Sequence, residues 1–233
     1  MRNLFKKKPK ILITNDDGID AAGIWLLAEA ATAYGDVTIV APSEEQSAMS
    51  HGISRVRMQV LEYKSPYKKI KAYHVPGKPA DCVITAHEEL GLTFDYVLSG
   101  VNHGTNLGVD INYSGTVGAA SEAIIYGIPA AAFSSTMGND EVTKNELKKV
   151  LDFIFEKQLW QKETIINVNF PKSKTGRAKG IQMTRQAMIM ERPFTEGSDL
   201  KAWDAGFVSI TPIGIDRTRH DLLKEWERYN YEW

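Results

Sequence analysis

Two carboxylates stand side by side where a short apolar run ends. Residues 11–14 are Ile-Leu-Ile-Thr, and Asn15, Asp16, Asp17 and Gly18 follow. Adjacent negative charges are costly unless a cation compensates them, and a hard divalent cation is the simplest compensation. The alternative is that Asp17 caps the next helix while Asp16 is solvated, because Asp is a preferred N-cap residue. The pair alone leaves both interpretations open.

Two further polar loops carry oxygen-bearing side chains. Residues 42–54 supply the hydroxyls of Ser43, Ser47 and Ser50, and a later loop supplies the amides of Asn102 and Asn106. Oxygen ligands suit Mg²⁺, Mn²⁺ or Ca²⁺ better than zinc. Such residues also occur simply as turn formers. Because all three loops follow predicted strands, whose carboxyl ends share one edge of a parallel sheet, they are expected to converge on one divalent metal ion.

A fourth segment could receive an anion. Ser114, Gly115 and Thr116 precede a run of small residues with helical character. Ser114 or Thr116 could cap that helix, and its N-terminal N–H groups could bind a phosphate. A plain helix cap, with glycines for close packing, explains the same residues.

The elements that must position these residues alternate between strand and helix. This order favours an α/β fold with a parallel sheet covered on both faces. Gly100 is expected to end one strand, and residues 102–116 are expected to form a long functional loop. Strands are predicted at residues 11–14, 37–40, 53–63, 69–75, 95–99, 129–134 and 165–169, and helices at residues 24–34, 79–90, 117–126 and 139–157.

The pattern changes from residue 179 onward. Residues 180–185 and 207–211 resemble short strands around a charged stretch, and residues 220–229 favour a helix. We expect a β-hairpin and helix that form an arm for oligomerisation. The predicted organisation is a catalytic core at residues 1–178 and an arm at residues 179–233, both parts of one domain.

Composition excludes several classes of function. The 28 Lys and Arg residues balance 29 Asp and Glu, so no bulk positive field favours a nucleic acid polymer as the main partner. Cys82 is the only cysteine, which excludes an intramolecular disulfide and favours the cytoplasm. The longest apolar stretch is shorter than the ~20 residues of a membrane-spanning helix, so no membrane association is expected.

Six segments together closely resemble the SurE family of survival proteins. The Asn-Asp-Asp-Gly block at residues 15–18 and the Ser-Gly-Val-Asn block at residues 99–102 are the most specific. The order and spacing agree over nearly the whole chain. The similar segments are residues 11–19, 41–47, 79–83, 99–108, 113–117 and 206–212.

The resemblance implies a metal-dependent 5′/3′-nucleotidase with acid phosphatase activity. It implies a Rossmann-like core with a swapped C-terminal arm, in homodimers or homotetramers. By position, the metal ligands would be Asp16, Asp17, Ser47 and Asn102, of which Asp16, Asp17 and Asn102 would also be catalytic. The residues expected to bind substrate phosphate are Asn15, Asn106, Ser114, Gly115 and Thr116.

The sequence departs from the family pattern at two places. Lys78 replaces the usual threonine of a Gly-Thr-Pro-Ala-Asp motif, and Ala48-Met49 replaces the glycine that commonly follows the ligand serine. Lys78 could add a phosphate contact or only a surface charge. His103, beside Asn102, could contact substrate or be incidental.

The predicted reaction is hydrolysis of nucleoside 5′-monophosphates, with 3′-monophosphates as further candidates, by in-line attack of metal-activated water. One magnesium or manganese ion is the expected cofactor, with calcium as an alternative occupant in a crystal. Whether Asp16 acts as base or nucleophile stays open. A haloacid-dehalogenase-type phosphatase is disfavoured because one residue separates its two Asp residues, whereas Asp16 and Asp17 are adjacent. A non-enzymatic metal or nucleotide sensor would use the same residues.

Overall fold

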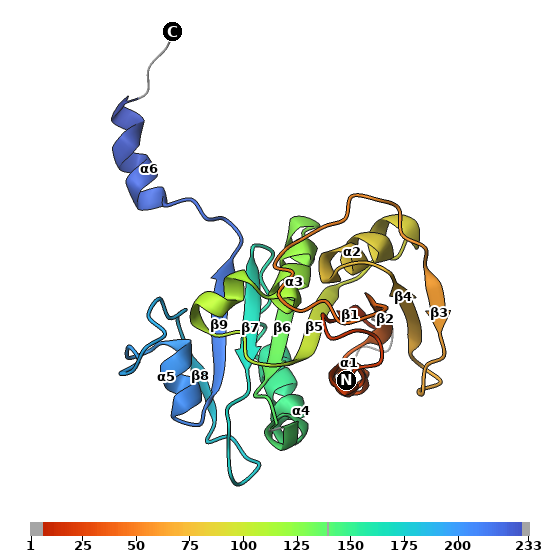
Figure 1. The fold of residues 1–233 in the computed structure, drawn as a ribbon, viewed down its shortest axis with the longest axis horizontal. Coiled ribbons are helices and arrows are strands. Elements are labelled where there is room, and N and C mark those ends of the chain that lie inside the picture. Colours follow the sequence, from red (N-terminus) through yellow and green to blue (C-terminus); the bar gives the residue numbers. More distant parts are fainter. Residues whose placement is uncertain (1–6, 139, 230–233) are drawn as a thin grey trace.

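A mixed sheet of nine strands runs through the described part of the chain, residues 7–138 and 140–229, in this computed structural model (Figure 1). Its strands are β1 (Lys10–Thr14), β2 (Asp36–Pro42), β3 (Leu61–Tyr63), β4 (Lys71–Val75), β5 (Tyr96–His103), β6 (Ala130–Ser135), β7 (Thr164–Asn169), β8 (Ile181–Met183) and β9 (Val208–Gly214). The helices are α1 (Ala22–Ala31), α2 (Pro79–Ile84), α3 (Gly115–Ile125), α4 (Asp140–Glu156), α5 (Asp199–Asp204) and α6 (His220–Trp226).

The strand order is β3-β4-β2-β1-β5-β6-β7-β9-β8. Strands β4, β2, β1, β5, β6 and β7 run parallel, which confirms the predicted α/β fold. From β1 the chain passes to β2 on one side of β1, and it later crosses to β5 on the other side of β1. In such sheets ligands bind beyond the carboxyl ends of the strands where the order reverses. That place is the end of β1 and β5.

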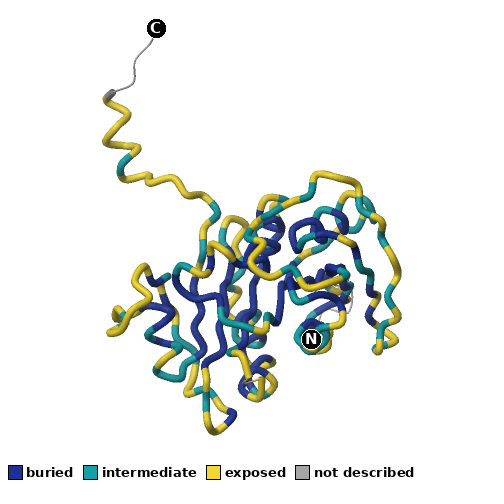
Figure 2. The backbone as a smooth tube through the Cα atoms, viewed as in Figure 1, coloured by how far each residue is buried: buried dark blue, intermediate teal, exposed yellow. Residues whose placement is uncertain are grey.

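Helices cover both faces of this sheet, as the alternation of elements predicted. Ile11 and Ile13 of β1 face the side packed by α1 and α4, and Leu12 faces the side packed by α2 and α3. Successive side chains of a strand point to opposite faces, so a strand buried on both faces is apolar throughout. The burial colours of Figure 2 show the central strands dark along their length.

Strand β5 is longer than predicted, because Gly100 does not end it. Its pairing with β6 shifts register between Ser99 and Asn102 and then resumes, with Asn102 opposite Ser134. Gly100 adopts a φ of 123°, and a Cβ there would lie 2.2 Å from the Phe133 carbonyl oxygen. Only glycine allows the strand to continue past this point. Asn102 therefore stands on a strand end, not in the predicted loop.

Other boundaries differ locally. The strand predicted at residues 53–63 is reduced to β3, and residues 53–60 are irregular. The helix predicted at residues 79–90 is α2 followed by a π-helical turn at Thr85–Glu89. The loop predicted at residues 102–116 contains a 3-10 helix, Gly108–Asn112. The predicted start of α4 at Asn139 lies outside the described residues.

The C-terminal region does not form the predicted hairpin. β9 pairs antiparallel with β7 in the main sheet, and β8 pairs parallel with β9. A hairpin needs a tight turn, whereas residues 184–207 and α5 connect β8 to β9 and permit a parallel crossover. Beyond β9, α6 stands away from the body and has no buried residue (Figures 1 and 2). The boundary between residues 178 and 179 stays a prediction.

Cys82, a residue of α2, has a free and fully buried thiol. Among the described residues, no helix is long and apolar enough to cross a membrane.

The centre of the sheet gives a direct test of the core. Phe133 of β6 is fully buried in the layer beneath α1 and α4. Phe133→Ala should lower the free energy of unfolding by about 3–5 kcal/mol, because it leaves a cavity in a close-packed interior. Urea denaturation followed by circular dichroism measures this change. Val56→Ala, at a residue 67% exposed, is the control, and equal losses for the two variants would contradict the described packing.

Candidate active site

A cavity of about 470 Å³ opens where β1 and β5 end. It brings together residues from the three loops that the sequence singled out, together with several that it did not. Its lining residues are Asp16, Asp17, Glu45, Ser47, Ala48, Asn102, His103, Asn106, Asp110, Tyr113, Ser114 and Met137.

Asp16 is buried and is held by the first turn of α3. Its Oδ1 accepts a hydrogen bond of 2.5 Å from the Thr116 hydroxyl, and its Oδ2 accepts one of 3.2 Å from the Thr116 backbone N–H. A helix N-terminus carries unpaired N–H groups and a partial positive charge, which favour a carboxylate. The anion at the start of α3 is therefore Asp16 itself.

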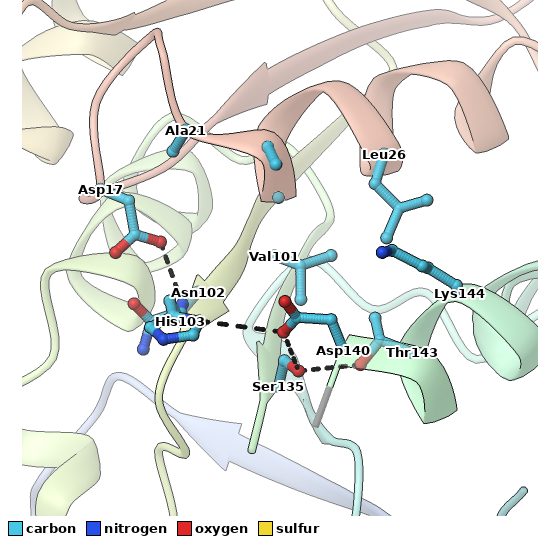
Figure 3. A pocket seen from close by; sticks show the side chains of 12 residues that line it. Asp17, Ala21, Leu26, Val101, Asn102, His103, Ser135, Asp140, Thr143 and Lys144 are labelled. Atoms are coloured by element: carbon cyan, nitrogen blue, oxygen red, sulfur yellow. Dashed lines mark hydrogen bonds and ion pairs between the residues drawn. The ribbon is translucent and has the colours of Figure 1, made fainter. Parts of the chain in front are cut away.

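Asp17 is oriented by β5. Its Oδ2 accepts a hydrogen bond of 3.0 Å from the His103 backbone N–H, shown as a dashed line in Figure 3. Asp17 does not cap α1, because the N-cap of that helix is Ala21 and no side chain caps it. The capping interpretation of the acidic pair is therefore wrong.

Ser47, in the loop after β2, and Asn102, near the end of β5, line the same cavity. The Ser47 hydroxyl donates to Glu45 Oε1 at 2.6 Å, which leaves its oxygen lone pairs for a ligand. The Asn102 amide nitrogen donates to the Gly104 carbonyl at 2.8 Å, and no described residue donates to the amide oxygen. Both side chains thus keep an oxygen acceptor at the cavity.

The Ser47 loop is fixed by its backbone. Gln46 N–H donates to the Asp16 carbonyl at 2.7 Å, and Ser50 N–H donates to the Tyr113 carbonyl at 2.9 Å. The loop also lies directly on α3, since a Cβ at Gly118 would come within 2.3 Å of the Ser50 carbonyl oxygen. The small residues at the start of α3 serve this close packing.

Asn106 and Ser114, two of the residues expected to bind phosphate, line the cavity. The Asn106 amide nitrogen donates to the Ser134 hydroxyl at 2.7 Å, and its backbone N–H donates to Asn169 Oδ1 at 2.7 Å. Ser114 caps α3 by accepting from the Val117 N–H at 3.1 Å. These bonds fix the two side chains before any substrate binds.

Asn15, Gly115 and Thr116, the other residues expected to bind phosphate, are not among the residues that line the cavity. Asn15 is fully buried and donates to the Gly18 carbonyl at 2.8 Å, so it shapes the acidic loop. Thr116 is fully buried, and both its backbone N–H and its hydroxyl donate hydrogen bonds to Asp16. The first turn of α3 thus acts on the carboxylate, while Gly115 lies against the Asp16 side chain.

Sequence reasoning missed four residues of the lining: Glu45, Asp110, Tyr113 and Met137. Glu45 could have been found from its place two residues before Ser47, whereas the others carry no signal in spacing. Lys78 is not among the residues that line this cavity. Its ammonium donates to the Ile53 carbonyl at 3.3 Å, and its backbone N–H donates to the Asp81 carboxylate. His103, by contrast, lines the cavity.

The cavity is strongly acidic. Asp16, Asp17, Glu45 and Asp110 line it, and no lysine or arginine among the described residues does. Burial raises the pKa of Asp16 to about 6, with a further increase from the charge of Asp17 and a decrease from the Thr116 hydrogen bonds. Burial also raises the pKa of Asp17, opposed by the His103 N–H and assisted by Glu45. Both shifts arise mainly because burial removes the carboxylates from water, which disfavours their charged form.

The donor set fits one hard divalent cation. Carboxylate, hydroxyl and amide oxygens are the atoms that Mg²⁺ and Mn²⁺ prefer. Within the described ranges, no three His, Cys, Asp or Glu side chains are grouped to hold a metal by themselves. A metal bound here would therefore need oxygen donors besides carboxylates, and Ser47 and Asn102 are two that line the cavity.

The contact between Thr116 and Asp16 generates a prediction. Thr116→Val removes the hydroxyl that donates to the carboxylate, so the pKa of Asp16 should rise above about 6, because a lost hydrogen bond disfavours the charged form. The carbon-13 shift of the Asp16 carboxyl, followed against pH in metal-free protein, measures this. Thr32→Val, at an exposed threonine, should leave it unchanged; a lower pKa in the Thr116 variant would contradict the assigned contact.

Comparisons with known proteins agree with this architecture. Residues 11–192 match the family described as survival protein SurE. The 5′-nucleotidase SurE of Christiangramia forsetii is 36% identical, with 94% of this chain and 96% of that protein covered. The 5′-nucleotidase SurE 1 of Thermus thermophilus is 37% identical, with 92% and 95% covered. The crystal structure of the SurE protein from Aquifex aeolicus aligns with a TM-score of 0.77 at 32% identity, covering 95% of this chain and 99% of that one. The chain therefore belongs to the SurE survival protein family.

Proposed function

We propose that this protein is a metal-dependent phosphomonoesterase that hydrolyses nucleoside 5′-monophosphates to nucleoside and phosphate. The relatives named 5′-nucleotidase SurE support the substrate class. One magnesium or manganese ion is proposed at Asp16, Asp17, Ser47 and Asn102, with Asn106 and Ser114 as phosphate contacts. Hydrolysis of 3′-monophosphates belongs to the same proposal.

One observation carries the proposal of a metal. Four carboxylates line the cavity without any lysine or arginine among the described residues. A phosphate dianion would be repelled by these charges, and its transfer to such a site is costly unless a positive charge neutralises it. A divalent cation satisfies both the carboxylates and the phosphate.

The residues of the chain have distinct roles in the proposed reaction. A bound divalent cation would withdraw charge from the phosphate and acidify a water molecule. Thr116 and the His103 N–H hold Asp16 and Asp17 in fixed orientations, so that no reorganisation is needed during the reaction. Asn106, fixed by Ser134 and Asn169, orients the phosphate.

Proton transfer can be assigned within the same cavity. With Asp16 and Asp17 committed to the cation, Glu45 and Asp110 are the remaining carboxylates that line it. We propose that one of them accepts the proton of the attacking water. A nucleophilic Asp16 is disfavoured because its carboxylate is engaged both by the hydrogen bonds from Thr116 and by the proposed cation.

The proposal also includes acid phosphatase activity and cytoplasmic localisation. Acid phosphatase activity, meaning hydrolysis of simple phosphomonoesters under acidic conditions, would use the same groups. Cytoplasmic localisation is supported by the free, buried thiol of Cys82.

Oligomerisation through the C-terminal region is also proposed, as a homodimer or homotetramer. Helix α6 stands off the body with Leu223 and Trp226 exposed at 44% and 58%. Met188 and Ile189 are exposed at 76% and 61% in the segment before α5. Exposed apolar groups on a projecting element are typical of a surface that another copy covers.

Phosphate release tests the enzymatic proposal. Wild-type protein should release phosphate from AMP, GMP and 3′-AMP, lose this activity in EDTA, and regain it with Mn²⁺ or Mg²⁺. Asp16→Asn should lower the rate at least about a hundredfold, since even residues that only support a metal ligand cost 10–100-fold when removed. Asp36→Asn, at an exposed aspartate that begins β2, should match wild type.

Two results would overturn this proposal. Full activity in EDTA would exclude the metal role. Metal and nucleotide binding without any turnover would instead establish the sensor function that the same residues could serve.

Light scattering tests the assembly. Wild type should elute as a dimer or tetramer, and the double variant Leu223→Asp with Trp226→Asp should have a smaller mass, because charge disfavours apolar burial. Lys224→Asp, at an exposed residue of the same helix, is the control. A monomeric wild type, or an unchanged mass in the double variant, would contradict the proposed interface.

A further inference from the structure

A second cavity adjoins the acidic one and shares a wall with it. It has a volume of about 310 Å³, and Asp17, Asn102 and His103 line both cavities. These three residues therefore form a ridge between two compartments. A molecule whose phosphate lies on the acidic side has a place for its remaining atoms on the other side.

One wall of the second cavity is apolar. Ala21, Ala22 and Leu26 come from the start of α1, and Val101 comes from β5 (Figure 3). Gly23 brings the helix against the strand, since a Cβ there would lie 2.0 Å from the Val101 carbonyl oxygen. Apolar walls with a few placed polar groups are typical of small-molecule sites of about 300–1,000 Å³.

The opposite wall is polar and comes from β6 and α4. The Thr143 hydroxyl donates to the Ser135 hydroxyl at 3.0 Å, which donates to Asp140 Oδ1 at 3.3 Å. His103 Nδ1 lies 3.8 Å from the same carboxylate oxygen. Figure 3 shows Asp140 turned toward this chain of hydroxyls. The position of the carboxylate is therefore set by its neighbours.

Lys144 completes the polar wall. It stands four residues after Asp140, which places both on one face of α4, and it lines the cavity together with Leu26 (Figure 3). No described residue forms an ion pair with it. The cavity thus offers a hydrogen-bond acceptor and a cationic donor above an apolar surface. Nucleobases present N–H donors and ring acceptors along the edge of a flat apolar ring.

We propose that this second cavity binds the nucleoside of the substrate, with the base against Leu26 and Val101 and its edge toward Asp140 and Lys144. This inference rests on the proposed phosphomonoesterase function. The ridge of Asp17, Asn102 and His103 then lies beside the ester bond that is cleaved. Asp140 and Lys144 are then specificity residues, which line the nucleoside cavity and are not among the residues that line the acidic one.

Filling the cavity tests this assignment. Ala22 is exposed at the cavity wall, so Ala22→Trp adds bulk without disturbing the core. The KM for AMP and GMP should rise at least about tenfold more than the KM for glycerol 2-phosphate, which has no base, because the lost contacts belong to the nucleoside. Ala33→Trp, at an exposed alanine outside the cavity, is the control.

A second variant does not depend on added bulk. Lys144→Met keeps a long apolar side chain and removes the charge, and it should weaken inhibition by free adenosine and guanosine at least about threefold, as expected for loss of one hydrogen bond to a charged group. Lys157→Met, at an exposed lysine beyond α4, is the control.

The outcomes separate the two proposals. If wild type hydrolyses neither AMP nor glycerol 2-phosphate with any metal, the proposed function fails. If wild type is active and Ala22→Trp changes the KM of both substrates equally, or Lys144→Met leaves nucleoside inhibition unchanged, the nucleoside cavity is wrong and the phosphomonoesterase proposal stands.

Discussion

The burial of Asp16 is the constraint on which the candidate site depends. A carboxylate with so little access to water is tolerated only where donors replace the lost hydration. Thr116 supplies two of them, and the start of α3 adds the positive end of a helix. Because these donors compensate only part of the cost, the pKa of Asp16 stays raised to about 6. The remaining need for positive charge is what makes the cavity suited to a cation.

The same constraint organises the loops around Asp16. Its backbone carbonyl accepts from Gln46, which fixes the segment that carries Ser47, and its neighbour Asp17 is tied to the end of β5 at His103. The groups proposed to bind the cation are thus linked by hydrogen bonds before any ligand is present. Such preorganisation is valuable in catalysis because no energy is spent on ordering the site during the reaction. It also concentrates like charges, which lowers the stability of the metal-free protein.

The sequence was sufficient for the parallel sheet and for the convergence of the three loops. Apolar runs such as residues 11–14 are buried on both faces, so their composition and spacing were enough to predict them as buried strands. What could not be predicted depends on contacts between distant segments. Strand β5 continues past Gly100 only because β6 accepts a shifted register, and Thr116 is turned toward Asp16 instead of the cavity because α3 docks beside β1. The cavity between α1 and α4 could not be predicted from the sequence either, since Leu26 and Lys144 line one cavity only in the folded chain. The expected hairpin was wrong because α5 intervenes between β8 and β9.

The hydrogen bond between Asp16 and Thr116 has a consequence for the order in which the protein assembles. These residues are 100 positions apart, so during synthesis the carboxylate leaves the ribosome long before its donors exist. Contacts of such high sequence separation form late, because closing a long loop costs entropy that only later contacts repay. Cation affinity should therefore be acquired at the end of folding, when β1, β5 and α3 have docked. A metal that binds only the fully folded state would stabilise the whole domain by mass action. Its binding would therefore report that folding is complete.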